Sequence, residues 1–427
     1  MILRIVNFLK SGRKFSPVLL GNLCVIGSTF LLSKYVAVMY GPGGMALLGQ
    51  YSNILGLLQN LSTAGIDNGV VRYVAEADSD STDSRKKYLS ASLQIVLIFA
   101  LITFIFVISN SEYIADKIFF SGEYHYLVML IGCVMLPLAL QNWIKPVMNG
   151  MGSLNSLAFV NVLMAVGVVF LVISGFFSPD LAQSQFFLLI PVTLIFSMFF
   201  CLFWGYKKKV FYFRFGLMAE KSLYLKFFKY SMMSGTAAVV VPVVAISVRN
   251  VIVNYSGVDD AGLFEAVSRF SNAYLSVITT TLAVYFLPQL SAAKNFDEQT
   301  VQMHAMMRKV VSLVFVLSVF VWIAYPLIFS ILYSDIFVVS RKLMLMQVTA
   351  DIFKMASWVL AYQMIARGMA YTYIILEVSF GLMRYIASLI FVPWWGLDGA
   401  VAAYMVTNIV YLLVLIFLFR DQFKRVR

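Results

Sequence analysis

Long apolar stretches separated by short polar breaks recur along the whole chain. A lipid hydrocarbon core about 30 Å thick needs roughly 20 apolar residues per helical span, and most of these stretches reach that length. They lack the alternation of apolar and polar residues that marks a membrane β-barrel strand, so the pattern predicts membrane-spanning α-helices. About twelve are expected, at residues 16–40, 44–66, 88–109, 125–144, 155–177, 185–206, 232–254, 261–290, 310–332, 343–366, 370–392 and 398–419.

Composition supports the same interpretation. The chain is 61% hydrophobic and 12% charged, whereas soluble domains are about 45–50% apolar and about 25% charged. The mean hydropathy is +0.87. The first apolar stretch continues past the length of a signal peptide without a small-residue cleavage site, so we expect it to be retained as the first span. The sequence therefore predicts an all-α, multi-pass membrane protein without a sizeable soluble domain.

The distribution of basic residues predicts the orientation. With a cytoplasmic N-terminus, the loops on the inner side and both termini hold 23 of the 32 Lys and Arg residues. The outer loops hold only Lys117, Arg341 and Lys342. By the positive-inside rule, we expect both termini on the cytoplasmic side of the membrane. The net charge of +12 then reflects topology and attraction to anionic lipids, and nucleic acid is not an expected partner.

The chain is predicted to divide into two halves. Its longest inner loop, 207–230, interleaves basic and aromatic residues, as an amphipathic segment on the membrane surface does. We expect an N-terminal six-helix bundle at 1–206, this linker, and a C-terminal six-helix bundle at 231–427.

An internal repeat relates the two halves. A shift of 215 residues places 34–41 over 249–256, so that Lys34 falls on Arg249. A shift of 216 residues places 148–154 over 364–370. Because an even number of helices separates the copies, the repeat is parallel. It predicts two pseudo-symmetric six-helix bundles around a central cavity.

Two motifs resemble a known family. They are GPGGMALLGQYSNILGLLQNLSTAGIDNGVVRYVAE at 41–76 and GLDGAVAAYMVTNIVYLL at 396–413, with further similarity at 247–253 and 285–291. Both are similar to the bacterial polysaccharide-precursor flippases of the O-antigen and enterobacterial common antigen (lipid III) type. These belong to the multidrug/oligosaccharidyl-lipid/polysaccharide exporter superfamily.

The resemblance implies a function. Such a transporter flips oligosaccharide repeat units on undecaprenyl pyrophosphate from the cytoplasmic to the periplasmic leaflet, by ion-coupled alternating access. The implied partners are the lipid-linked oligosaccharide, inner membrane lipids and other polysaccharide assembly proteins. A multidrug exporter of the same superfamily is the alternative, and it would favour acidic residues over basic ones in the cavity.

Charged residues within the predicted spans are the candidate site residues. Each costs roughly 2.5–3.5 kcal/mol at a helix centre, so each needs a partner, water or a route to the membrane surface. We expect Asp351 to pair with Lys354, and Glu265 with Arg269, because these spacings place both members on one helix face. Arg384 and Glu377 lie two turns apart and are expected to form a weaker pair or an ion-coupling site.

Lys34 and Arg249 have no acid at helical spacing. Either both reach the lipid head groups, or they face each other across the cavity and bind the pyrophosphate. The predicted substrate-binding residues are Lys34, Arg72, Arg249, Arg269 and Arg384, and the predicted ion-coupling residues are Asp67, Asp351 and Glu377.

Enzymatic activity is not expected. The two histidines, His125 and His304, lie near predicted helix ends, and no P-loop motif is present. No cofactor or metal is therefore predicted. A membrane-embedded polymerase or ligase is a third possibility, but it would require a larger outer loop than the one at 110–124.

Overall fold

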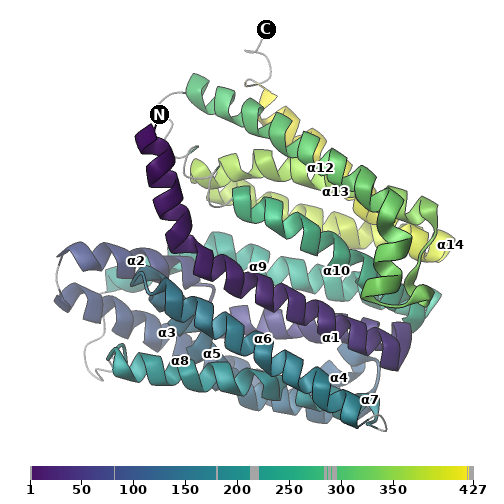
Figure 1. Cartoon of the computed structure of the whole chain (residues 1–427), viewed down its shortest axis with the longest axis horizontal. Helices are drawn as coiled ribbons and strands as arrows, with labels where there is room; N and C mark the ends of the chain where they lie inside the picture. Colours follow the sequence, from purple (N-terminus) through teal and green to yellow (C-terminus); the bar gives the residue numbers. More distant parts are fainter. Residues whose placement is uncertain are drawn as a thin grey trace. The chain divides into compact units, whose positions relative to one another are not determined.

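The computed structural model describes residues 2–80, 82–178, 181–211, 221–282, 286, 290, 296–420 and 422. The predicted segments at 207–230 and 261–290 and the motif at 285–291 fall partly outside these residues. The described residues fold into helices and contain no strand (Figure 1). In the first half these are α1 (Ile2–Ser62), α2 (Asp67–Asp80), α3 (Thr82–Ser109), α4 (Ser111–Phe119), α5 (His125–Gly150), α6 (Leu154–Phe177), α7 (Gln183–Leu189) and α8 (Ile195–Lys207). In the second half they are α9 (Lys221–Ser256), α10 (Val258–Thr281), α12 (Phe296–Leu332), α13 (Arg341–Ala366) and α14 (Ala370–Leu418).

The helices account for the predicted spans. Nine segments of the described chain are long and apolar enough to cross a bilayer. Two of them, α1 and α14, each consist of two arms that meet at a glycine with positive φ, Gly41 (64°) and Gly396 (55°). Helix α10 (Val258–Thr281) occupies the eighth predicted stretch but is not one of these nine segments. The prediction of an all-α membrane protein with about twelve spanning helices is confirmed.

Several helices extend beyond their apolar stretches. Residues 145–150, predicted to begin an inner loop, belong to α5, so Lys145 lies within that helix. Helix α12 begins at Phe296, inside a region predicted to be a loop. Hydropathy reports where a helix leaves the hydrocarbon, whereas backbone hydrogen bonds continue into the interfacial region, so the predicted helices are too short at these ends.

The described chain forms two compact units. The first comprises Met1–Tyr35 and Gln50–Pro242, and the second comprises Val36–Gly49 and Val243–Arg427. The bend of α1 at Gly41 therefore belongs to the second unit, although it lies early in the sequence. The bundles predicted at 1–206 and 231–427 stay a prediction.

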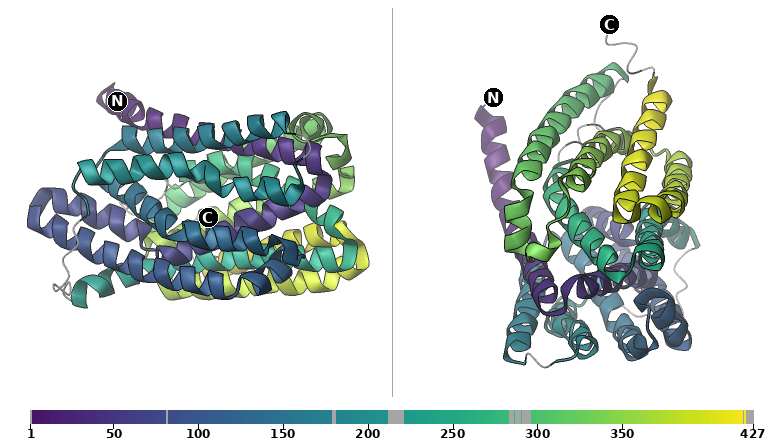
Figure 2. Two further views of the ribbon diagram at one scale, coloured as in Figure 1. Left: turned by 90° about the horizontal axis from the view of Figure 1, so that it is seen from below. Right: turned by 90° about the vertical axis from the view of Figure 1, so that its right-hand side faces the viewer.

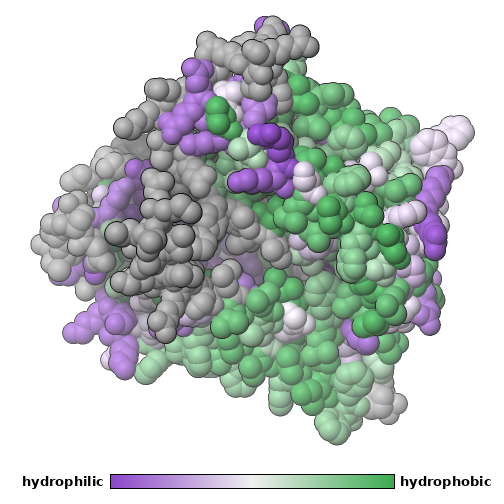
Figure 3. Space-filling view, turned by 45° about the horizontal axis from the view of Figure 1, so that its top comes forward, coloured by the Kyte–Doolittle hydropathy of each residue, from purple (hydrophilic) through white to green (hydrophobic). Residues whose placement is uncertain are grey.

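Within the units, helices pack side by side. In the first unit α3 lies against α5, and in the second α13 lies against both α12 and α14 (Figures 1 and 2). Apolar side chains form a broad surface on the face shown in Figure 3, with hydrophilic ones toward its edges. Exposed apolar side chains over such an area are expected where helices face lipid.

The backbone repeats at the predicted shift. Gly152 and Gly368, 216 positions apart, have φ values of 67° and 66°. Each ends a helix with the same hydrogen bonds: the amide after the glycine donates to the carbonyl five residues earlier, Ser153 to Met148 and Met369 to Met364, both at 2.8 Å. This is the Schellman arrangement, which requires a residue that tolerates the left-handed conformation.

Candidate functional site

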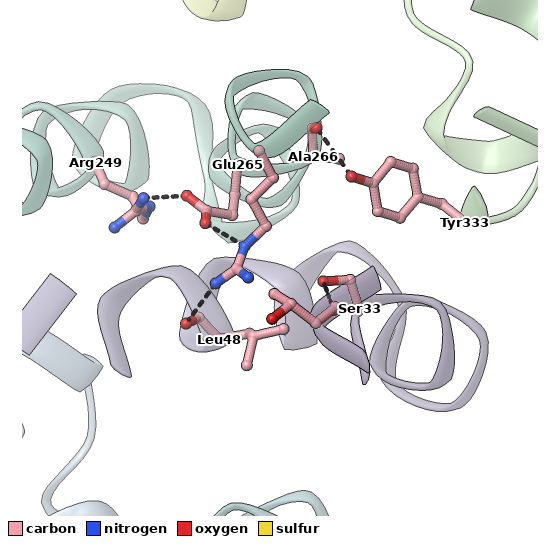
Figure 4. Close-up of polar contacts among 8 residues, drawn as sticks. Ser33, Leu48, Arg249, Glu265, Ala266 and Tyr333 are labelled. Atoms are coloured by element: carbon pink, nitrogen blue, oxygen red, sulfur yellow. Dashed lines mark hydrogen bonds and ion pairs between the residues drawn. The ribbon is translucent and has the colours of Figure 1, made fainter. Parts of the chain in front are cut away.

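An ion-paired triad lies in the interior of the second unit. Glu265 on α10 binds two guanidinium groups, Arg249 from α9 through Oε2 and Arg269 from its own helix through Oε1 (2.5 Å) (Figure 4). The exposed fractions of the three side chains are 7%, 3% and 16%. Arg269 also donates to the carbonyl of Leu48 at 3.1 Å. One carboxylate thus holds two cations and fixes them to the bend of α1.

The triad depends on a small residue in α1. A Cβ atom at Gly49 would lie 2.6 Å from Glu265 Oε2 and 2.8 Å from Arg249 Cζ. Only glycine allows the α1 backbone to approach the ion pair this closely, which explains why the segment Val36–Gly49 packs with the second unit.

The interpretation of Arg249 changes accordingly. Arg249 has an acidic partner after all, from the next helix, so the expectation of an unpaired cation is wrong. Lys34 is exposed on α1 in the first unit. The predicted substrate-binding roles of Lys34, Arg249 and Arg269 stay predictions.

A second polar cluster surrounds Asp351, which is fully buried on α13. Its Oδ1 accepts hydrogen bonds from Tyr404 Oη (3.0 Å) and Gln347 Nε2 (3.2 Å). Its Oδ2 accepts from the hydroxyls of Ser271 and Tyr274. Four donors from α10, α13 and α14 therefore converge on one carboxyl group and satisfy its hydrogen-bonding capacity.

Tyr404 links this cluster to two cations. Its hydroxyl binds Asp351, while Arg384 Cζ lies 4.7 Å and Lys354 Nζ 5.7 Å from its ring centre. Lys354 Nζ also donates to Asn272 Oδ1 at 3.2 Å. Among the described residues, neither cation has a carboxylate within ion-pair distance, and Arg384 Nε is buried without a hydrogen-bond partner. Both cations lie over a π-face, and Asp351 attracts them electrostatically without forming a direct ion pair.

Asp351 and Lys354 form no direct ion pair among the described residues, because hydroxyl and amide donors from its own and neighbouring helices already occupy the carboxyl group. The two charges still attract each other. Glu377 and Arg384, two helical turns apart, likewise form no ion pair among these residues, so the expected alternative of an ion-coupling site stays a prediction. The Glu265–Arg269 pair is confirmed.

The remaining predicted residues lie in the first unit. Arg72 on α2 is exposed and pairs with Glu76 at 2.6 Å. Burial raises the pKa of Asp67, at the start of α2, to about 6, against the opposing effects of the Thr63 hydroxyl and the Lys145 ammonium. Lys145 Nζ lies 3.3 Å from Met164 Sδ. The roles of Arg72 in substrate binding and of Asp67, Asp351 and Glu377 in ion coupling stay predictions.

Sequence reasoning missed the uncharged members of the cluster. Gln347 lies four residues before Asp351 within an apolar stretch, and polar residues at that spacing share one helix face. That signal was available for Gln347. No comparable signal marks Tyr404, because tyrosine is frequent in this chain.

The fold and these clusters define a class of protein. The chain is a multi-pass membrane protein whose interior holds charged side chains, as in membrane transporters. The fold resembles a multidrug resistance MATE family transporter of the MOP superfamily in an inward-facing conformation, with a TM-score of 0.79, 14% identity, and coverage of 93% of this chain and 94% of that one. The fold also resembles a MOP superfamily transporter from Pyrococcus furiosus whose binding pocket is described as having reverse polarity. The TM-score is 0.70 at 14% identity, and the match covers 96% of this chain and 94% of that one.

The chain belongs to the family described as "Polysaccharide biosynthesis protein", whose pattern matches residues 11–294. It is also 28% identical over 399 residues to proteins named "Lipid III flippase" from Escherichia coli (strain K12) and Shigella flexneri. Each alignment covers 91% of this chain and 93% of the relative.

The triad yields a stability prediction. Glu265→Gln leaves two buried guanidinium groups without a counter-ion, which costs about 3–5 kcal/mol for a buried pair. Glu76→Gln is the matched control, because Arg72–Glu76 has the same four-residue spacing but is about half exposed, and exposed pairs contribute about 0–1 kcal/mol. We expect Glu265→Gln to lower the thermal unfolding temperature of the detergent-purified protein strongly and Glu76→Gln to leave it nearly unchanged. Equal unfolding temperatures for the two variants would contradict this account.

Proposed function

We propose that the chain is a transporter that flips lipid-linked oligosaccharides across the bacterial inner membrane, from the cytoplasmic to the periplasmic leaflet. Membership of the polysaccharide biosynthesis family and end-to-end similarity to two proteins named lipid III flippases support this assignment. The substrate is an oligosaccharide on undecaprenyl pyrophosphate, and the mechanism is alternating access rather than catalysis. By analogy with the resembling family, we also propose that transport is coupled to an ion gradient. The same analogy suggests contacts with other assembly proteins and specificity for O-antigen.

The proposal that the substrate is anionic rests on one observation. The two clusters of the second unit contain four cations and two carboxyl groups. Glu265 is shared by Arg249 and Arg269, whereas Lys354 and Arg384 lie over Tyr404 with their charges available. A pyrophosphate fits this excess, since guanidinium groups donate paired hydrogen bonds to phosphate oxygens and ammonium acts as a point charge.

The same observation disfavours the multidrug exporter. An amphipathic organic cation would require acidic groups that are free to bind it. Glu265 is occupied by two arginines, and Asp351 is occupied by four hydrogen-bond donors. The similarity to MATE structures, at 14% identity, concerns the fold.

The function is tested by deleting the gene in a bacterium that has no second flippase for this substrate. We expect lipid-linked oligosaccharides to accumulate on the cytoplasmic leaflet and surface polysaccharide to fall. The wild-type chain should restore the polysaccharide, whereas Lys354→Gln and Arg384→Gln together should fail at normal protein level. Arg384→Lys should be intermediate, because it keeps the charge and loses the planar fork.

Arg420→Gln is the matched control for that experiment. Arg420 also lies over an aromatic ring, Phe417 at 5.1 Å, but it is exposed near the C-terminus. It should restore export fully. Surface polysaccharide that is unchanged by the deletion, with new sensitivity to cationic dyes, would instead support a drug exporter.

We also propose that both termini are cytoplasmic. Single cysteines in the segments 110–124, 176–184 and 333–342 should then react with a membrane-impermeant thiol reagent added to intact spheroplasts. A cysteine in 207–230 should react only after the membrane is opened. Labelling of 207–230 from outside would reverse the proposed orientation.

A further inference from the structure

The first unit contains an apolar groove between three helices. Its volume is about 680 Å³, within the range of about 300–1,000 Å³ that is typical of ligand sites. The end of α1, the middle of α3 and the first half of α9 line it, and we call it the α1–α3–α9 groove. The helix break after α1 helps to form it, since Ala64 and Gly65 adopt positive φ values (52° and 62°) and both line the groove.

The mouth of the groove is apolar. Phe99 on α3 and Phe228 on α9 line it and are 41% and 62% exposed. Leu61 and Met232, which also line it, are exposed as well. A rim of exposed apolar side chains on a membrane-spanning unit is stable against lipid and unfavourable against water. An occupant of this groove therefore enters from the bilayer and is itself apolar.

A smaller cavity continues the groove. It has a volume of about 330 Å³ and shares Asn60 with the groove. Ser52, Asn53 and Asn60 from α1 supply its polar groups, and Ala237, Ala238, Val241 and Pro242 from α9 supply an apolar wall. Asn60 Nδ2 donates to the carbonyl of Gly56 at 2.8 Å. The side-chain amide of Asn53 lines this cavity and forms no hydrogen bond with a described side chain. Among the lining residues of this cavity are hydroxyls and amides but no charged side chain.

The two cavities together are complementary to an amphiphile. The apolar groove suits a hydrocarbon chain, and the adjoining amides suit sugar hydroxyls or phosphate oxygens. We propose that the α1–α3–α9 groove binds the first isoprene units of the polyprenyl chain of the lipid-linked substrate. This inference rests on the proposed flippase function and adds a binding site for the part of the substrate that stays in lipid.

Most of the residues that line the groove are apolar. Tyr224 contributes its ring to the lining, while its hydroxyl donates to Gln94 Oε1. The hydroxyl of Tyr224 therefore has a hydrogen-bond partner that does not line the groove.

One glycine allows the groove to be filled without disturbing the protein, and a second provides a control outside it. A Cβ atom at Gly235, which lines the groove, meets no atom within 4 Å. Gly27 on α1 also has open space around its Cβ position, is exposed, and lies outside the groove. Gly235→Leu and Gly27→Leu therefore form a matched pair that adds the same side chain inside and outside the proposed site.

The test is photo-crosslinking of the full-length protein in lipid nanodiscs. p-Benzoylphenylalanine is placed at Thr236, in the groove, or at Val166, an exposed apolar position on α6. The probe is undecaprenyl phosphate, in the presence of excess phosphatidylglycerol. We expect the isoprenoid adduct at position 236 to exceed that at 166, and Gly235→Leu to lower it about tenfold, which corresponds to ~1.4 kcal/mol. Gly27→Leu should leave the yield unchanged.

Other outcomes overturn the inference. Equal isoprenoid yields at 236 and 166 would mean general exposure to lipid. An adduct of phosphatidylglycerol alone at 236 would mean that the groove holds bulk lipid. Either result leaves the flippase function standing if the gene deletion still traps lipid-linked oligosaccharide inside. A normal export phenotype in the deletion, by contrast, refutes the flippase function whatever the crosslinks show.

Discussion

An ionised side chain inside a bilayer must have a partner, because the surrounding hydrocarbon offers no water to solvate it. This constraint organises the second unit. Glu265 compensates Arg249 and Arg269 together, and four donors compensate Asp351. The first arrangement joins the consecutive helices α9 and α10 to each other and to α1, and the second joins α10, α13 and α14. The helices of this unit are held in register by charge compensation as well as by apolar packing, which contributes little specificity among lipid-like side chains.

Among the described residues of the second unit, Lys354 and Arg384 lack a direct ion pair, and function is proposed at these two cations. Lys354 and Arg384 lie over the ring of Tyr404, whose hydroxyl in turn binds Asp351. Cation–π contacts stabilise a cation but leave its hydrogen-bond donors available. A phosphate that reaches these groups would complete the compensation. The apolar groove of the first unit complements this arrangement, since the substrate has both an anionic head and a hydrocarbon chain.

Much of the fold could be predicted from the sequence, because span length and apolar composition follow directly from bilayer thickness. The repeat at a shift of 216 could also be predicted, and Gly152 and Gly368 show its physical basis in a shared helix ending. The pairing of charges was predictable only within a helix, as for Glu265 and Arg269. The partner of Arg249 lies beyond the turn at Gly257, and the donors to Asp351 come from α10 and α14 as well as α13. Such contacts depend on tertiary packing, which no local spacing encodes.

The most direct test of the account is transport by the purified protein. Proteoliposomes would carry lipid-linked oligosaccharide, with the sugars initially protected in the inner leaflet, and a lectin outside would report their arrival in the outer leaflet. The account predicts that the wild-type protein makes the sugars accessible, and that Lys354→Gln combined with Arg384→Gln slows this to the rate of empty liposomes. Equal rates for the wild-type and double-variant proteins would contradict the claim that these uncompensated cations bind the anionic head group.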